Sequence, residues 1–187
     1  MTGTVIRIRP EYLLRALALL LAVVAIPLGI AHTPYLHGRA AMLTPERRDI
    51  MCYLDRAAGW ADALSREADT LQRILEEATR DPDAGRLLDL GQTGTQALER
   101  LAGLAQQADS AQVPPAESAL HQDLGDAVAV ELQAAQDVLA CVGAPGQDAL
   151  ALAQQDLADA RGRVATLQDV IRQQQAALAR RGGDHGQ

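Results

Sequence analysis

The chain has 187 residues, contains no Lys, Asn or Phe, and carries a formal net charge of -7. Such an acidic protein repels nucleic-acid phosphates and anionic lipid headgroups, so we expect no nucleic-acid partner and no membrane contact beyond the N-terminal segment. Ala, Leu, Gln and Arg are abundant while aromatic residues make up 2% of the chain, and because these abundant residues favour helices the composition predicts an all-α fold.

The N-terminal segment has the features of an export signal. Three arginines precede an unbroken apolar run over residues 16–26, and this order directs the following chain out of the cytoplasm. Gly29 and Ala31 are small enough for the positions that a signal peptidase admits just before its cut. We therefore predict a signal peptide over residues 1–31, followed by a linker over residues 32–43.

An uncleaved signal anchor is the main alternative. The uncharged run includes residues 16–36, which at helical rise are long enough to cross about 30 Å of hydrocarbon, although two prolines and a histidine interrupt the second half. A buried helix of a cytosolic fold is a third hypothesis. The first two hypotheses place the rest of the chain outside the cytoplasmic membrane, where it is secreted, periplasmic or anchored by residues 16–36.

Four amphipathic segments follow, and turn signals separate them. Thr44, Pro45 and Glu46 begin the first segment with a hydroxyl cap, a proline that needs no amide partner, and an acid near the positive end of the helix dipole. Along every segment apolar residues recur at spacings of three and four, which is the pattern of coiled-coil helices. The predicted helices cover about 45–80, 86–108, 115–142 and 147–181.

Short connections make consecutive helices antiparallel neighbours, since each apolar stripe must be buried. We therefore predict an antiparallel up-down-up-down four-helix bundle over residues 44–181, preceded by the N-terminal hydrophobic export or anchor helix. The seven-residue repeat predicts a left-handed supercoil. Residues 182–187 are polar and rich in glycine, so we expect a disordered tail there.

The second predicted helix is weakest over residues 91–96, GQTGTQ. Two glycines and two threonines lower the helix propensity of this stretch, which predicts a kink or a late helix start. The functional alternative is a hinge, or a gap that faces a ligand.

The only two cysteines are Cys52 and Cys141, and in an exported protein such a pair suggests a disulfide. The predicted bundle opposes that bond, because its first and third helices run parallel and would separate the two thiols by roughly 30 Å along the axis. A disulfide needs Cα atoms within about 7 Å. The alternatives are unpaired cysteines, a bond between molecules, or a crossover in the topology.

Four other side chains are candidates for a role in binding. Glu117 and His121 lie one helical turn apart, but the repeated Glu-x-x-His pattern of di-iron bundles is absent. We therefore interpret Glu117 as an acid in a first helical turn and His121 as its solvated neighbour. Tyr53 and Trp60 on the first helix suggest a contact patch for a partner; the alternative is that Trp60 covers the edge of the bundle.

No motif in the sequence predicts catalysis. The chain lacks a phosphate-binding glycine loop, a nucleophile elbow, and zinc or calcium motifs, so we predict no enzyme, no catalytic or metal-binding residue and no cofactor. The sequence favours an exported, non-catalytic helical bundle that acts through contacts with a protein partner, through self-association, or as a structural component of the envelope. The alternative is a membrane-tethered bundle that binds or senses a small molecule near Gly91 and Gly94.

Overall fold

The chain forms two units, Met1–Leu43 and Thr44–Gln187, in a computed structural model that describes residues 35–36, 39–40, 44–80 and 83–183. In the first unit, the described residues form an antiparallel hairpin of β1 (Tyr35–Leu36) and β2 (Arg39–Ala40). The hairpin lies within the predicted linker. The predicted signal peptide, residues 1–31, falls outside the described residues, and so does the alternative anchor over residues 16–36 except for Tyr35 and Leu36.

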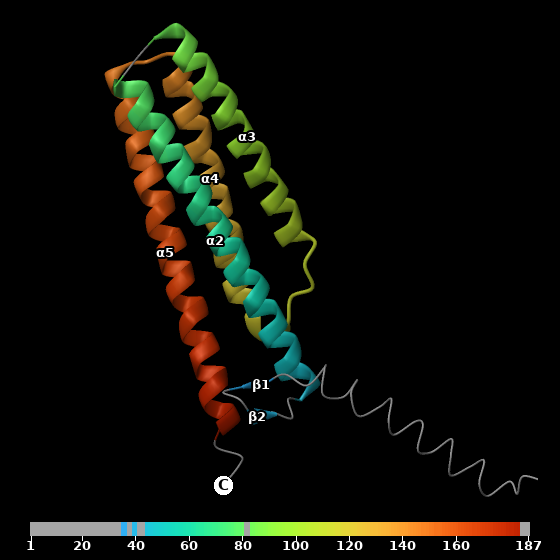
Figure 1. The fold of residues 1–187 in the computed structure, drawn as a ribbon. Helices are drawn as coiled ribbons and strands as arrows, with labels where there is room; N and C mark the ends of the chain where they lie inside the picture. The colour runs from blue at the N-terminus through green and yellow to red at the C-terminus, as the bar shows by residue number, and fades with distance from the viewer. Residues whose placement is uncertain (1–34, 37–38, 41–43, 81–82, 184–187) are drawn as a thin grey trace, which may run out of the picture. The chain divides into compact units, whose positions relative to one another are not determined.

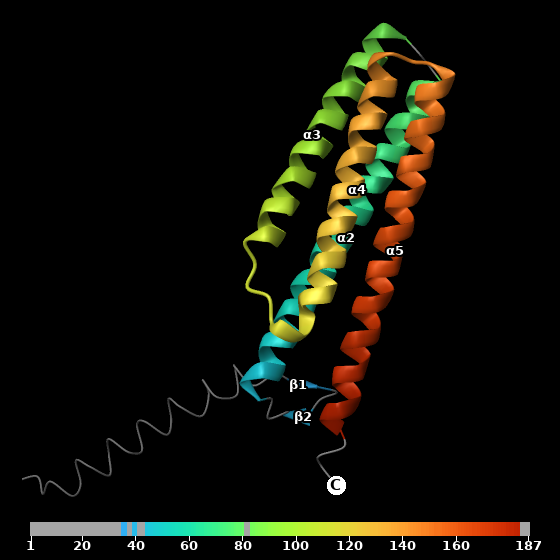
Figure 2. The same ribbon diagram turned by 180° about the vertical axis from the view of Figure 1, so that it is seen from behind.

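The second unit consists of helices packed against one another, which confirms the prediction of an all-helical bundle of four helices. Figures 1 and 2 show that each helix runs in the opposite direction to the one before it. The helices are α2 (Pro45–Arg80), α3 (Ala84–Asp109), α4 (Ser118–Gly143) with the preceding 3-10 turn η1 (Pro115–Glu117), and α5 (Gln147–Gly183).

Local hydrogen bonds explain where these helices differ from the prediction. The α3 helix begins before residue 86 because Oδ2 of Asp83 accepts hydrogen bonds from the amides of Gly85 at 3.1 Å and Arg86 at 3.4 Å, which is an N-cap. The predicted third helix starts instead as the η1 turn, where the amide of Glu117 donates to the carbonyl of Pro114 at 2.9 Å. The α5 helix continues through Gly183 into the predicted tail.

The central pair of the bundle is α2 and α4. These two helices contact each other as well as their sequence neighbours, and Figures 1 and 2 show α3 and α5 on opposite sides of the pair. As a result α4 is buried along two stripes rather than one. The predicted stripe supplies Leu120, Leu124, Val128, Ala135 and Val142, and the second supplies Ala127, Glu131, Ala134, Val138 and Cys141.

The predicted apolar stripe of α5 forms part of the core, which is built mainly from Leu, Ala, Val and Ile. This stripe extends from Leu150 to Leu178 and has one polar member, Gln174. All three of these residues are only partly buried. Its central members are at most 3% exposed: Ala153, Leu157, Ala160, Val164, Leu167 and Ile171.

A regular row of polar contacts joins α5 to α2 beside this core. The side-chain amide of Gln175 donates to Asp55 at 3.2 Å and that of Gln168 donates to Asp62 at 3.0 Å, while Arg161 pairs with Asp69. Each step of seven residues along α2 is matched by a step of seven back along α5. This is the register of an antiparallel heptad pair, in which polar residues flank the apolar stripe.

The α3 helix runs without interruption through residues 91–96, so the predicted late start is wrong. The hydroxyls of Thr93 and Thr95 donate to carbonyls one turn earlier, at 3.0 and 2.9 Å. Gly94 is buried, and a Cβ built on it would lie 2.7 Å from Cδ2 of Leu139 and 3.8 Å from Cδ1 of Ile74. Glycine at this position lets α3 approach α4 and α2 closely.

Alanine at the two glycines of this stretch is expected to have opposite effects. Gly91→Ala should raise the free energy of unfolding by about 0.5–1 kcal/mol, since alanine favours the helix and no neighbouring atom lies within 4 Å of the new Cβ. Gly94→Ala should lower it by about 1–3 kcal/mol, because the methyl group overpacks the contact with Leu139. Chemical denaturation measures both changes, and adding Leu139→Ala should remove the difference between the two sites. Equal gains for both glycines would contradict the close approach.

Candidate functional site

The most unusual side chain of the bundle is Glu131, on the second buried stripe of α4. It is 0% exposed, and neither carboxyl oxygen has a hydrogen-bond partner among the described residues. A buried carboxylate without partners is strongly disfavoured, and such a group takes up a proton instead. Burial, with a further contribution from the negative charge of Glu67, raises the pKa of Glu131 to about 8.

Two ion pairs involve the α2 residues on either side of Ala68, next to Glu131. Arg100 of α3 binds Glu67 with two hydrogen bonds, at 2.7 and 2.8 Å, and Arg161 of α5 pairs with Asp69. The bond to Glu67 raises the pKa of Arg100. Both guanidinium groups are therefore bound to carboxylates of α2, and neither is hydrogen-bonded to Glu131. We call Glu131 and these two ion pairs the Glu131 site.

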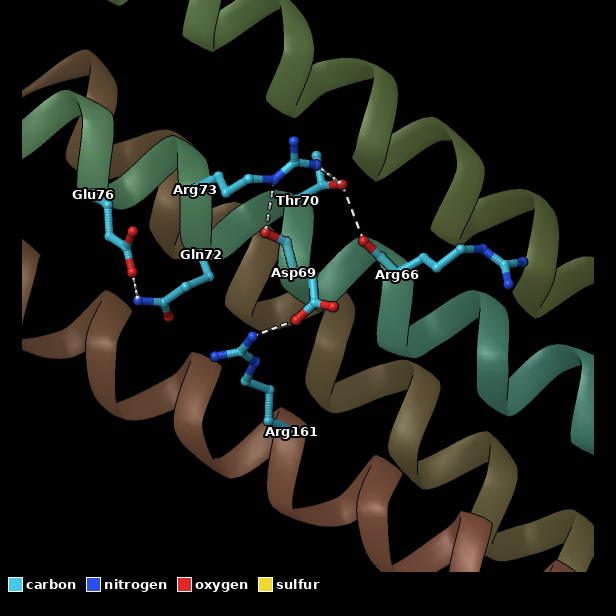
Figure 3. A network of polar contacts seen from close by, with 7 residues as sticks. All are labelled: Arg66, Asp69, Thr70, Gln72, Arg73, Glu76 and Arg161. Carbon is cyan, nitrogen blue, oxygen red and sulfur yellow. Dashed lines mark hydrogen bonds and ion pairs between the residues drawn. The ribbon is translucent and has the colours of Figure 1, made fainter.

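The ion pair on the α5 side belongs to a polar network on the surface of α2. Figure 3 shows Arg161 reaching from α5 to Asp69, whereas the other contacts drawn join residues within α2. These include the bond from Gln72 to Glu76 at 2.7 Å and the bond from Arg73 to the hydroxyl of Thr70 at 3.1 Å. Exposed contacts of this kind stabilise little, and only the pair of Arg161 with Asp69 joins α5 to α2 in this network.

A second polar cluster lies between the first turns of α2 and the start of α4. The hydroxyl of Tyr53, a fully buried residue, is hydrogen-bonded to Nδ1 of His121 at 3.1 Å. Glu117 is 7% exposed, its Oε2 has no partner among the described residues, and burial raises its pKa. Burial, followed by the charge of Glu117, raises the pKa of Tyr53 to about 12. The interpretation of His121 as a solvated neighbour is therefore wrong, because its ring is bonded to a core tyrosine.

The two residues of the predicted contact patch lie in different environments. Tyr53 is enclosed in the core and offers no side-chain surface to a partner. Trp60 is partly buried and packs edge to face on Tyr53, with the ring centroids 6.5 Å apart. Trp60 therefore covers the aromatic end of the core, and of the two residues it alone retains some exposed surface.

Cys52 and Cys141 are both free cysteines in the structure. Cys52 is exposed near the start of α2, and Cys141 is buried near the end of α4, where burial raises the pKa of its thiol. A groove of about 420 Å³ beside Cys52 is lined mainly by the start of α2 and by residues 112–115. Since the thiolate is the reactive form of cysteine, exposed Cys52 is the thiol open to reagents and Cys141 is protected.

Further grooves lie on the surface of the bundle. One of them, between α4 and α5, measures about 560 Å³ and is lined by charged and small residues that include Asp123, Asp159 and Arg163. The sequence suggests a ligand-facing gap near Gly94 as an alternative, but the side chain of Leu139 packs against Gly94 at this position. Within the described ranges, no three His, Cys, Asp or Glu side chains are placed to hold a metal ion.

Sequence reasoning missed Glu131, although the sequence contains a signal for it. Residues 124, 127, 131, 134, 138 and 141 follow one another at spacings of three and four, which is a second coiled-coil row beside the predicted one. Residue 131 lies outside the predicted stripe of this helix, so no core position was expected there. Only the packing of α4 against helices on several sides identifies it as a core position.

Comparison with known proteins gives no relative for this chain: no protein-family model, no curated protein and no solved structure matches it. Among the helices of the described segments, none combines the length and the apolar character that a membrane span requires.

Proposed function

We propose that the chain is an exported, non-catalytic helical-bundle protein that acts through protein–protein contacts or as a structural component of the cell envelope. The observation that carries the proposal is the filled core around Gly94, where Leu139 occupies the position at which a ligand-binding bundle would need a cavity. Bundles that bind small molecules keep their sites between facing helices. The order of charge and apolarity in residues 1–31 supports the export part of the proposal.

The contact surface that we favour is the first half of α2, from the groove beside Cys52 to Trp60. Trp60 is only partly buried, and tryptophan is enriched among the residues that dominate binding energy at interfaces. The groove beside Cys52, which includes Pro114 and Pro115, lies on the same helix. The first half of α2 therefore combines a partly exposed aromatic side chain with a groove.

Cys52 allows a direct test of this surface, because it is exposed while Cys141 is buried. A thiol-directed crosslinker on Cys52 should join the chain to its partner, or to a second copy, in the cells that produce it. Trp60→Ala should reduce the crosslinked product at least tenfold, and Leu88→Ala, on the exposed surface of α3, should leave it unchanged. A product that is insensitive to Trp60→Ala would contradict this contact surface. Cys52→Ser provides the control for labelling.

A further inference from the structure

We propose that Glu131 is a proton-controlled switch between α4 and α2: the two helices pack closely while its carboxyl group carries a proton, and they separate around Ala68 when that proton is lost. The inference concerns the bundle itself and does not rest on export or on a partner. If the switch were disproved, the proposed function would be unaffected. If the proposed function were disproved, the switch would likewise be unaffected.

The closed bundle offers little to stabilise a charge on Glu131: the backbone of Ala68 lowers its pKa, but burial and the charge of Glu67 raise the pKa by more. The side chain is 0% exposed, and both oxygens lack a partner among the described residues. Core residues that lie within one turn of it on its own stripe, Ala127 and Ala134, offer only methyl groups. An ionised carboxylate in such surroundings costs far more free energy than a neutral one.

The charged groups of the neighbouring helices add to this cost instead of relieving it. From α2, Glu67 and Asp69 both repel a negative charge on Glu131. The guanidinium groups that face the site from α3 and α5 belong to Arg100 and Arg161, and these are bound to Glu67 and Asp69. Opening the α2–α4 contact gives water access to the carboxylate, which is the remaining route to solvation.

The direction of the pH dependence follows from the proton balance. The pKa of Glu131 is raised from 4.5 to about 8 in the folded bundle, so between these values the folded state binds a proton that the unfolded chain has lost. Stability from this group is fully present below pH 4.5 and is lost as the pH rises through about 8. Exposure of the α2–α4 interface then depends on the pH of the surroundings.

Denaturation of the full chain between pH 5 and pH 8 tests the switch. For each unit of pH, the unfolding equilibrium constant of the natural chain should rise by a factor about ten times larger than the factor for Glu131→Gln. This is the effect expected for one proton that only the folded state binds. Because the two proteins share every other titratable group, the difference between their slopes is the quantity to measure. Glu99→Gln, at an exposed site on α3, should keep the natural slope. Equal slopes for the natural chain and Glu131→Gln would overturn the proposal.

Two further measurements use the natural chain, so they do not depend on whether Glu131→Gln folds. The first measures the pKa of Glu131 directly, and the second distinguishes local from global opening. A carbon-13 NMR titration of the Glu131 carboxyl in the natural chain should show a midpoint near pH 8, and a midpoint in the ordinary glutamate range would overturn the proposal. Hydrogen-exchange protection around Ala68 and Glu131 should fall by about a hundredfold from pH 6 to pH 8. An equal loss of protection in all four helices would overturn the local opening.

Discussion

Replacing Leu101 by alanine is expected to lower the free energy of unfolding by about 2–5 kcal/mol. Leu101 is 0% exposed on α3, and its removal leaves a cavity in a core that has few large side chains to fill it. Since natural proteins of this size are stable by only about 5–15 kcal/mol, the change removes a large share of the total. Urea denaturation of the full chain gives the free energy directly.

Leu88 provides the matched control, because it is a leucine of the same helix that is 65% exposed. Leu88→Ala should change the free energy of unfolding by no more than about 0.5 kcal/mol. The pair tests whether α3 packs against the bundle in the observed orientation. Similar losses at the two sites would mean that α3 presents a different face to the core.

Replacing Tyr53 by alanine is expected to lower the free energy of unfolding by about 3–5 kcal/mol, as for other buried aromatic residues. The ring is fully buried at the end of the core and packs on Trp60 and on His121. The Tyr53→Phe variant keeps the ring and loses the hydrogen bond to His121, so its cost should be only about 0.5–1.5 kcal/mol.

The same tyrosine predicts a loss of stability at high pH. Because the pKa of Tyr53 is raised from 10.0 to about 12 in the folded state, the folded chain keeps a proton that the unfolded chain loses between these values. Stability should therefore fall as the pH rises from about 10 to about 12, and Tyr53→Phe should abolish that fall. If the natural chain and Tyr53→Phe lost stability in parallel over this range, Tyr53 would not be the buried group responsible.

The heptad pattern was sufficient to predict most of the bundle because it follows from local periodicity. The α5 stripe from Ala153 to Ile171 is buried as its spacing predicts, since the apolar stripe of an amphipathic helix packs against the neighbouring helices. The second stripe of α4 was not predicted, because periodicity in one helix does not reveal which helix lies at the centre of a bundle. Capping by Asp83 was likewise missed, and this moved the start of α3.

The polar sites were harder to predict because they depend on contacts between distant segments. Tyr53 and His121 are 68 residues apart, and the sequence offers no local sign that they meet. The sequence suggests a contact patch of Tyr53 and Trp60, whereas the structure places Tyr53 in the core stripe of α2. Gly94 was recognised as unusual, yet whether it leaves a cavity or admits a neighbouring side chain depends on Leu139, which belongs to another helix.

Intact-mass analysis of the chain in separated cell fractions tests whether the bundle is exported, on which the proposed function depends. We expect the chain in an exported fraction with a mass that lacks residues 1–31, or the full-length chain in the membrane fraction if the signal remains as an anchor. Full-length protein in the cytosol would contradict the export on which the proposed function depends.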